Sequence, residues 1–188
     1  MNRYRLLLAV LAGSVLLNVA LAHRLRQWNR LFAASPDAML QTGTILPPFQ
    51  ADDLLGNKHT VAYDQPSKPT VLYVFTPPCG WCLRNMDSFK ALIAQKGSEY
   101  RFIGVSLSKE GLKEYVASHG LEFPVYSGLP SETQKTYKMG GTPQTIVISP
   151  QGRVVKNWMG AYVGTQKSDV ENFFHISLPP VQTDTAGT

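Results

Sequence analysis

The chain has 188 residues, of which 44% are hydrophobic, so it can form one folded domain with an extension but is too short for two domains of usual size. Residues 1–30 contain five arginines and no acidic residue, which leaves 13 basic and 13 acidic residues in the rest of the chain. This neutral balance argues against a nucleic-acid partner, because such partners select basic surfaces. Two cysteines are too few for a disulfide-rich scaffold or a site with four cysteine ligands.

The N-terminus has a pattern typical of segments that enter a membrane. Residues 6–22 carry no charge and follow two arginines, which predicts either a short transmembrane helix or the apolar part of a signal peptide. Ala20-Leu21-Ala22 fits a cleavage site, whereas an apolar helical face continues beyond it as far as Phe32. We expect residues 1–34 to form an uncleaved anchor with a juxtamembrane helix, although cleavage after Ala22 stays open. The arginine count on the two sides favours by itself a cytoplasmic domain.

One domain, residues 45–176, is expected after a linker at residues 35–44, and residues 177–188 are expected to be a flexible tail. The segment Thr70–Phe75 is β-branched and aromatic and lies between prolines, which predicts a buried central strand. The other expected strands are residues 48–52 and 58–62, which form a hairpin, and residues 101–107, 122–126, 144–149 and 153–159. The expected helices are residues 80–95, 109–118, 131–138, with Ser131 as its cap, and 165–174. Alternating strands and helices followed by a hairpin predict an α/β fold with a mixed sheet flanked by helices.

The residues with reactive side chains lie where the central strand meets the following helix. Cys79 and Cys82 are separated by two residues, and Cys79 stands at the expected start of that helix. Free N–H groups and the helix dipole favour a thiolate at such a position. We therefore predict that Cys79 is the exposed attacking thiolate and that Cys82, one turn further, is the shielded resolving thiol of a redox-active disulfide.

Three other interpretations of the cysteine pair are weaker. A purely structural disulfide would close a ring too small to stabilise much chain. A zinc site would need two more ligands, and the four histidines show no ligand spacing. Attachment of haem would need a histidine where Leu83 stands. We expect neither a metal nor a cofactor.

A second motif, Gly140-Gly141-Thr142-Pro143, precedes the strand expected at residues 144–149. Proline lacks an N–H group, and the start of a strand is one of the few places in a sheet that suit it. The bond between Thr142 and Pro143 is expected to be either cis, as in a specific tight turn, or an ordinary trans bond that bounds the strand.

Residues 72–83 together with residues 141–149 resemble the thioredoxin superfamily, in which a cis-proline loop faces a Cys-x-x-Cys motif. More narrowly, residues 43–164 resemble its TlpA-like and redoxin branch, because an expected hairpin precedes the central strand and an extra strand and helix at residues 122–138 precede the Gly-Thr-Pro motif. The resemblance implies a thioredoxin-like fold and a thiol–disulfide oxidoreductase. It also implies a single-pass protein of the bacterial inner membrane, with its catalytic domain in the periplasm or at the cell exterior.

The resemblance further implies roles for particular residues. Cys79 and Cys82 would be the redox pair, and Thr142 and Pro143 would shape the groove that holds the extended chain of a partner. The partners would be client proteins with cysteines or disulfides and a membrane electron donor of the thiol-transfer type. We also expect Trp81, next to the cysteines, to contact clients.

The chain departs from the usual thioredoxin pattern at three positions. Pro78 replaces the usual tryptophan before the first cysteine, and Trp81 replaces the usual proline before the second. The acid that many thioredoxins bury six residues before the first cysteine is Tyr73 here. These changes leave open the direction of exchange and the group that accepts the proton of Cys82.

Two alternative functions remain. Thr76 lies three residues before Cys79, as in the peroxiredoxin motif, and Arg153 could supply the cation that a thiol peroxidase needs, although Leu72 replaces the proline of that motif. The second alternative is not an enzyme but a tethered assembly factor that binds clients through an apolar patch around Trp81.

Overall fold

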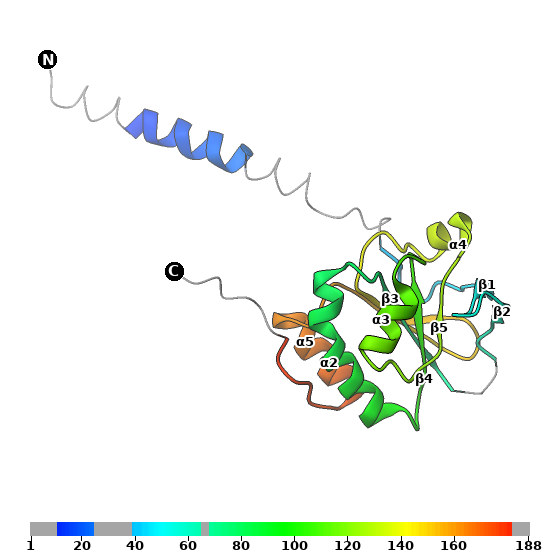
Figure 1. Ribbon diagram of the computed structural model, residues 1–188. Helices are drawn as coiled ribbons and strands as arrows, with labels where there is room; N and C mark the ends of the chain where they lie inside the picture. Colours follow the sequence, from blue (N-terminus) through cyan, green and yellow to red (C-terminus); the bar gives the residue numbers. More distant parts are fainter. Residues whose placement is uncertain (1–10, 25–38, 65–67, 182–188) are drawn as a thin grey trace, which may run out of the picture. The chain divides into compact units, whose positions relative to one another are not determined.

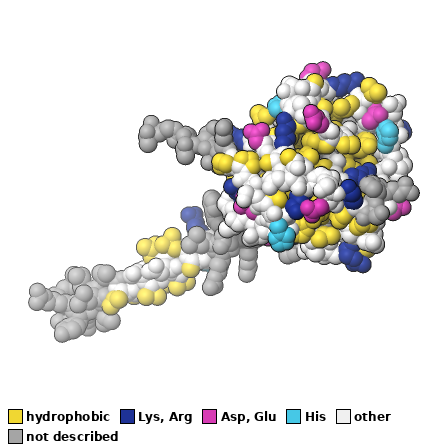
Figure 2. Space-filling view, turned by 90° about the horizontal axis from the view of Figure 1, so that it is seen from below, with side chains coloured by type: hydrophobic (Ala, Val, Ile, Leu, Met, Phe, Trp, Pro, Cys, Tyr) yellow, Lys and Arg dark blue, Asp and Glu magenta, His cyan; other side chains and the backbone are white. Residues whose placement is uncertain are grey.

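The computed structural model describes residues 11–24, 39–64 and 68–181, and the chain divides into two units, Met1–Met39 and Leu40–Thr188 (Figure 1). Residues 11–24 of the first unit are helical and exposed, and apolar side chains line the helix (Figure 2). Within the described ranges, no helix combines the length and the apolar character that a membrane crossing requires. The expected membrane helix at residues 6–22 is therefore not supported. Residues 6–10, which belong to that expected helix, and residues 25–34 lie outside the described ranges.

A five-stranded sheet forms the centre of the second unit, with the strand order β5-β4-β3-β6-β7. The strands are β3 (Thr70–Phe75), β4 (Arg101–Ser106), β5 (Val125–Tyr126), β6 (Gln144–Ile148) and β7 (Val154–Met159). Strand β3 pairs in parallel with β4 and antiparallel with β6, which confirms the expected mixed sheet. It is buried along its whole length, as its β-branched and aromatic residues predict.

Alternate residues of β3 point to opposite faces of the sheet, and each face has its own hydrophobic core. The helices are α2 (Gly80–Lys96), α3 (Leu112–Ser118), α4 (Ser131–Thr136) and α5 (Gly164–Phe174). Val71, Tyr73 and Phe75 pack in one core with residues of α2, α3 and α5. Leu72 and Val74 pack in the other core, with residues of the N-terminal hairpin and with the segment that follows α4. The first core carries the reactive residues.

The N-terminal hairpin forms a separate two-stranded sheet. Its strands are β1 (Phe49–Asp52) and β2 (Lys58–Val61), paired antiparallel with Phe49 opposite Val61. A single bridge between Asp52 and Ser127 joins it to the chain beside β5. The hairpin thus covers one face of the main sheet with Phe49 and Val61 and does not extend the sheet.

Three elements are shorter than the sequence predicts by two residues or more. Helix α3 begins at Leu112 and not at residue 109, because Gly111 adopts a left-handed conformation with φ of 65°. Strand β5 has two residues in place of five, since Pro124 has no N–H group to donate to a ladder. Helix α4 ends before Lys138, which has a φ of 50°. Ser131 is the first helical residue and not the cap, so that expectation was wrong.

Both segments next to the expected domain take part in packing. Leu40, in the expected linker at residues 35–44, is buried in the second core, and the Gly43 N–H donates to the Val154 carbonyl at 2.8 Å. Leu178, in the expected tail at residues 177–188, is buried in the first core. The Ser88 hydroxyl donates to the Pro179 carbonyl at 3.1 Å. These described residues are part of the folded unit.

Candidate active site

The turn between β3 and α2 places Cys79 at the start of a long helix. The Cys79 N–H donates to the Thr76 carbonyl at 3.1 Å, which closes the turn directly after the strand. Cys79 is the residue that caps α2, and its Sγ accepts a hydrogen bond from the Cys82 N–H at 3.0 Å. An N–H group aimed at the sulfur at the positive end of a helix stabilises a thiolate, so the local structure supports the predicted role of Cys79.

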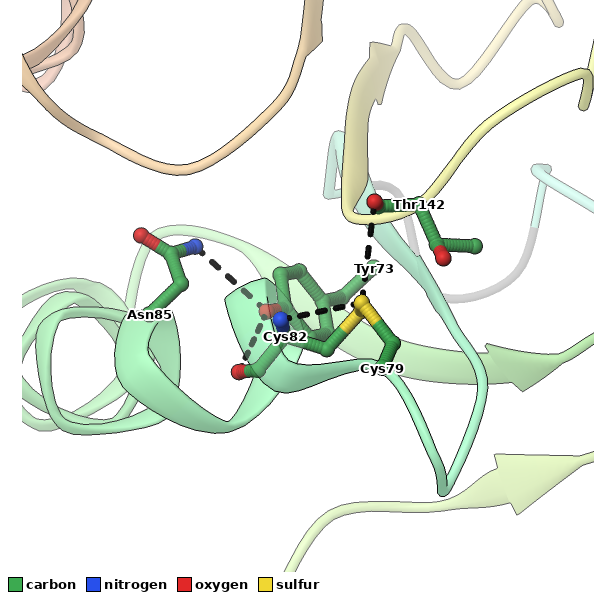
Figure 3. The surroundings of a disulfide bond; sticks show 5 residues. All are labelled: Tyr73, Cys79, Cys82, Asn85 and Thr142. Atoms are coloured by element: carbon green, nitrogen blue, oxygen red, sulfur yellow. Dashed lines mark hydrogen bonds between the residues drawn. A yellow bond between two sulfur atoms is a disulfide. The ribbon is translucent and has the colours of Figure 1, made fainter.

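Cys79 and Cys82 are joined by a disulfide in this structure, with their Cα atoms 5.2 Å apart (Figure 3). The two sulfurs differ in accessibility. Cys79 is partly exposed, whereas Cys82 is fully buried on the face of α2 that packs against β3. Cys79 is therefore accessible from solvent, whereas Cys82 is not.

The Gly-Thr-Pro motif lies directly opposite the disulfide. The Thr142–Pro143 bond is cis, which confirms the first of the two expectations for it. The Thr142 carbonyl oxygen is 3.6 Å from the Cys79 sulfur (Figure 3). The Gly160 N–H donates to the Pro143 carbonyl at 2.7 Å and ties this loop to the end of β7. The structure thus brings together two motifs that are about sixty residues apart in the sequence.

A groove of about 310 Å³ begins between Trp81 and the cis-proline loop. Trp81 is 45% exposed, and the Arg84 guanidinium lies 5.0 Å from the centre of its ring. The other lining residues are Thr142, Pro143, Met159, Gly160, Ala161, Val163 and Gln166. The sequence analysis identified the near side of this groove but missed its far wall, residues 159–166, which no local motif marks.

Behind the disulfide, a chain of buried hydrogen bonds links α2 to the sheet (Figure 3). The Tyr73 hydroxyl donates to the Cys82 carbonyl at 3.3 Å and accepts from the Asn85 side-chain amide at 3.4 Å. The Asn85 amide oxygen accepts from the Tyr162 N–H at 2.8 Å. The Tyr162 and Thr145 hydroxyls lie 2.6 Å apart. Sequence analysis noted Tyr73 only as a replacement for an acid and missed the other three residues.

Burial raises the pKa of Tyr73 far above its ordinary value, because the phenolate would lose its hydration. The same cause raises the pKa of Tyr162. Both phenols therefore stay neutral at physiological pH and act here as hydrogen-bonding groups and not as bases.

The structure does not bring Arg153 to the cysteines. Its guanidinium donates to the Gly43 carbonyl at 2.9 Å, beside the end of β6 that pairs with Thr70. Thr70 begins β3, whereas Cys79 follows its last residue, so the two sites lie at opposite ends of the central strand. The cation that the peroxidase interpretation assigned to Arg153 is therefore absent from the cysteine site.

The fold and this site together define the class: the protein is a thiol–disulfide oxidoreductase of the thioredoxin superfamily. Its cysteine pair follows the central strand and faces a cis-proline loop, as the resemblance implied. Within that class, the chain belongs to the AhpC/TSA family, whose profile matches residues 42–157.

Curated relatives carry the same activity in their names. The chain is 26% identical over 140 residues to the thiol–disulfide oxidoreductase ResA of Geobacillus kaustophilus, covering 73% of this chain and 78% of the relative. It is 25% identical over 149 residues to ResA of Bacillus subtilis, covering 77% and 81%.

Solved structures support the fold. The thioredoxin domain of a thiol–disulfide oxidoreductase from Bacteroides vulgatus superposes with a TM-score of 0.57 at 22% identity, covering 72% of this chain and 99% of that one. A thiol:disulfide interchange protein from a Bacteroides species superposes with a TM-score of 0.55 at 24% identity, covering 72% and 91%.

Proposed function

We propose that the protein exchanges electrons with cysteines of client proteins through the Cys79–Cys82 couple. The observation that carries this proposal is the disulfide at the mouth of α2, with the partly exposed Cys79 sulfur 3.6 Å from the cis-proline loop that borders the groove. A client cysteine in the groove would lie next to the one sulfur it can reach.

In the reducing direction, the reaction has two steps. The Cys79 thiolate attacks one sulfur of a client disulfide, which forms a mixed disulfide and releases the other client sulfur as a thiolate. The Cys82 thiol then loses its proton to solvent and attacks Cys79. The Cys79–Cys82 bond forms, the bond between Cys79 and the client breaks, and the second client thiolate leaves. Two electrons pass from the cysteine pair to the client, and the oxidising direction is the reverse.

The groove is proposed to hold an extended client segment. Trp81, Thr142 and Pro143 offer an apolar wall and a backbone edge of the kind that binds extended peptides. This interpretation assigns client contact to Trp81 and chain alignment to the cis-proline loop.

The experiment that tests the function is trapping with single cysteine variants. Cys82→Ser retains the attacking thiol but cannot resolve, so protein clients should accumulate as mixed disulfides on Cys79. Cys79→Ser should abolish both trapping and turnover. Mass spectrometry of the adducts and reduction of a disulfide-bonded protein substrate measure the two effects. Trapping by Cys79→Ser in place of Cys82→Ser would reverse the roles.

The same variants separate the alternative functions. Client capture that is unchanged in both variants would indicate an assembly factor that needs no thiol. Peroxide turnover that Cys79→Ser abolishes, with no loss of disulfide exchange in either variant, would indicate a thiol peroxidase.

We further propose that the catalytic domain works outside the cytoplasm, in the periplasm or at the cell exterior, and receives electrons from a membrane donor of the thiol-transfer type. The arginine-flanked apolar segment at residues 6–22 supports export. Alkaline phosphatase fused after Thr188 should be active, whereas an inactive fusion would place the domain in the cytoplasm. The mass of the mature protein distinguishes cleavage before His23 from an intact N-terminus.

A further inference from the structure

The second cysteine is buried beside uncharged hydrogen-bonding side chains. Cys82 and Asn85 are one turn apart on the same face of α2, and both are fully buried. Tyr73 from β3 contacts both residues, since its hydroxyl bonds the Cys82 carbonyl and the Asn85 amide. These contacts fix the helical turn that presents Cys82 to Cys79.

The same hydrogen bonds reach the client groove. The Asn85 amide oxygen holds the N–H of Tyr162, and Tyr162 lies between Ala161 and Val163, which both line the groove. Asn85 therefore fixes the position of Cys82 relative to the far wall of the groove. A displacement of the groove wall would be transmitted to Cys82 through the Asn85 side chain.

Within the described part of the chain, no buried carboxylate is present to receive the proton of Cys82. Of the aspartates and glutamates in residues 39–64 and 68–181, none is buried. The tyrosines of the core that contains Cys82 are Tyr73 on β3, Tyr162 after β7 and Tyr115 on α3, with the partly buried Tyr100 packed against the same core. Helix α5 contributes the apolar Val170 and Phe174 to this core. Arg84, also on α2, lies over the Trp81 ring near the surface.

We propose that Tyr73 and Asn85 are positioning residues that hold Cys82 and the groove wall in register through neutral hydrogen bonds, so that the resolving step proceeds without a carboxylate base. This proposal rests on the proposed function and concerns its second step. Cys82 gives its proton directly to water or hydroxide, and its thiolate then displaces the client from Cys79. The mixed disulfide is consequently long-lived at neutral pH, and the rate of its resolution follows the hydroxide concentration.

The test uses the full-length reduced protein and oxidised glutathione as the probe. Rapid mixing, acid quenching and mass spectrometry follow the glutathione adduct on Cys79 as it forms and decays. In the wild type, only the Cys82 thiolate attacks. The decay rate should therefore increase about tenfold with each unit of increasing pH, up to the pH at which Cys82 ionises.

Asn85→Asp provides the sharpest variant, because it has nearly the same shape and adds the missing carboxylate. One carboxylate oxygen can still accept from the Tyr162 N–H. Near pH 6, decay of the adduct should be on the order of tenfold faster than in the wild type, with a flatter pH profile.

Tyr73→Phe tests the positioning role, with Tyr115→Phe as its matched control. Both variants remove one buried phenol hydroxyl from the same core, but the Tyr115 hydroxyl has no hydrogen-bond partner within the described residues. Tyr73→Phe should slow adduct decay several-fold at every pH and leave the slope of the profile unchanged. Tyr115→Phe should leave both the rate and the slope as in the wild type.

Four results would overturn the proposal. A wild-type decay rate that is constant between about pH 6 and 8 would reveal a proton acceptor beside Cys82. An unchanged profile in folded Asn85→Asp would show that a carboxylate there has no effect. Equal rates in Tyr73→Phe and Tyr115→Phe would exclude positioning by Tyr73, and an altered slope in Tyr73→Phe would make its hydroxyl a proton carrier. If Asn85→Asp does not fold, the wild-type slope and the tyrosine pair still decide.

Failure of the proposed function gives a different result. Oxidised glutathione needs no groove, so the adduct would still form and decay while no protein client was trapped on Cys82→Ser.

Discussion

Trp81 and Leu83 are neighbours in the first turns of α2 and are similarly exposed, at 45% and 48%, yet only Trp81 lines the groove. An exposed tryptophan next to a reactive sulfur is costly to leave in water unless it contacts something, and large aromatic residues are frequent at the centre of binding surfaces. A comparison of Trp81 with Leu83 can therefore distinguish a role in the groove from the effect of an exposed hydrophobic side chain.

We predict that Trp81→Ala raises the KM for a protein client about tenfold, equivalent to roughly 1.4 kcal/mol, and changes kcat little. The KM rises because the substitution removes one wall of the groove, and kcat changes little because neither sulfur is affected. Reduction of oxidised glutathione, which needs no groove, should be unaffected. Leu83→Ala is the control and should leave both substrates unchanged. Equal effects of the two substitutions on the protein client would contradict the role given to Trp81.

At the scale of elements, the site depends on how the cis-proline loop approaches the end of β7. A side chain added at Gly141 would place its Cβ 3.2 Å from the Met159 sulfur, whereas a Cβ at Gly140 would meet nothing within 4 Å. Met159 lines the groove and has a flexible side chain, so it can yield, but only by moving. Of the two glycines, only Gly141 lies close to the end of β7.

We predict that Gly141→Val slows exchange with protein clients several-fold, because the displaced Met159 side chain narrows the groove. The cost in stability should stay at about 1–3 kcal/mol, as for other overpacked positions. Exchange assays and thermal unfolding followed by circular dichroism measure the two effects. Gly140→Val serves as the comparison and should exchange at the wild-type rate. If both variants exchange normally, contact between this loop and Met159 has no influence on client access.

At the scale of the whole molecule, both cores of the sheet contain buried phenols. Burial raises the pKa of Tyr63 and of Tyr73 well above the ordinary value of 10.0, and it raises the pKa of Tyr137 to about 12. The hydroxyls of Tyr63 and Tyr137 lie 2.5 Å apart in the second core, and Tyr137 donates to the Pro47 carbonyl. The folded state therefore retains phenolic protons that the unfolded chain loses above about pH 10.

The resulting prediction is cooperative alkaline unfolding. Each of these tyrosines contributes its full stabilisation below pH 10.0, the ordinary tyrosine value. As the pH rises above that value, each one lowers the free energy of unfolding by about 1.4 kcal/mol per pH unit until its folded-state pKa is reached. Tyrosinate absorbance and circular dichroism should change together in one transition. Normal titration of all tyrosines near pH 10 with the fold intact would contradict it.

Local patterns in the sequence were sufficient for the order of the elements and for the reactive pair. The β-branched run of Thr70–Phe75 and the helix start at Cys79 each depend on neighbours within a few residues, so their structure follows from spacing and side-chain type. The sequence marked Pro143 as the start of a strand but did not decide between a cis and a trans bond before it. The limits of α3 and β5 differ from the prediction for different reasons. The left-handed conformation of Gly111 is not visible in a local pattern, whereas the missing N–H group of Pro124 was a local signal that the prediction did not use.

The tertiary structure alone decided which distant residues share the site. Placing β6 beside β3 brings Thr142 to the Cys79 sulfur and carries Arg153 to the far end of the sheet, although the sequence allowed both near the cysteines. The contact between Asn85 and Tyr162 spans 77 residues, so neither position marks it. Strand order and register are set by the packing of whole faces. This is the physical reason why the sequence and its resemblance predicted the reactive sulfurs and the near side of the groove, but not the far wall of the groove or the buried contacts behind the disulfide.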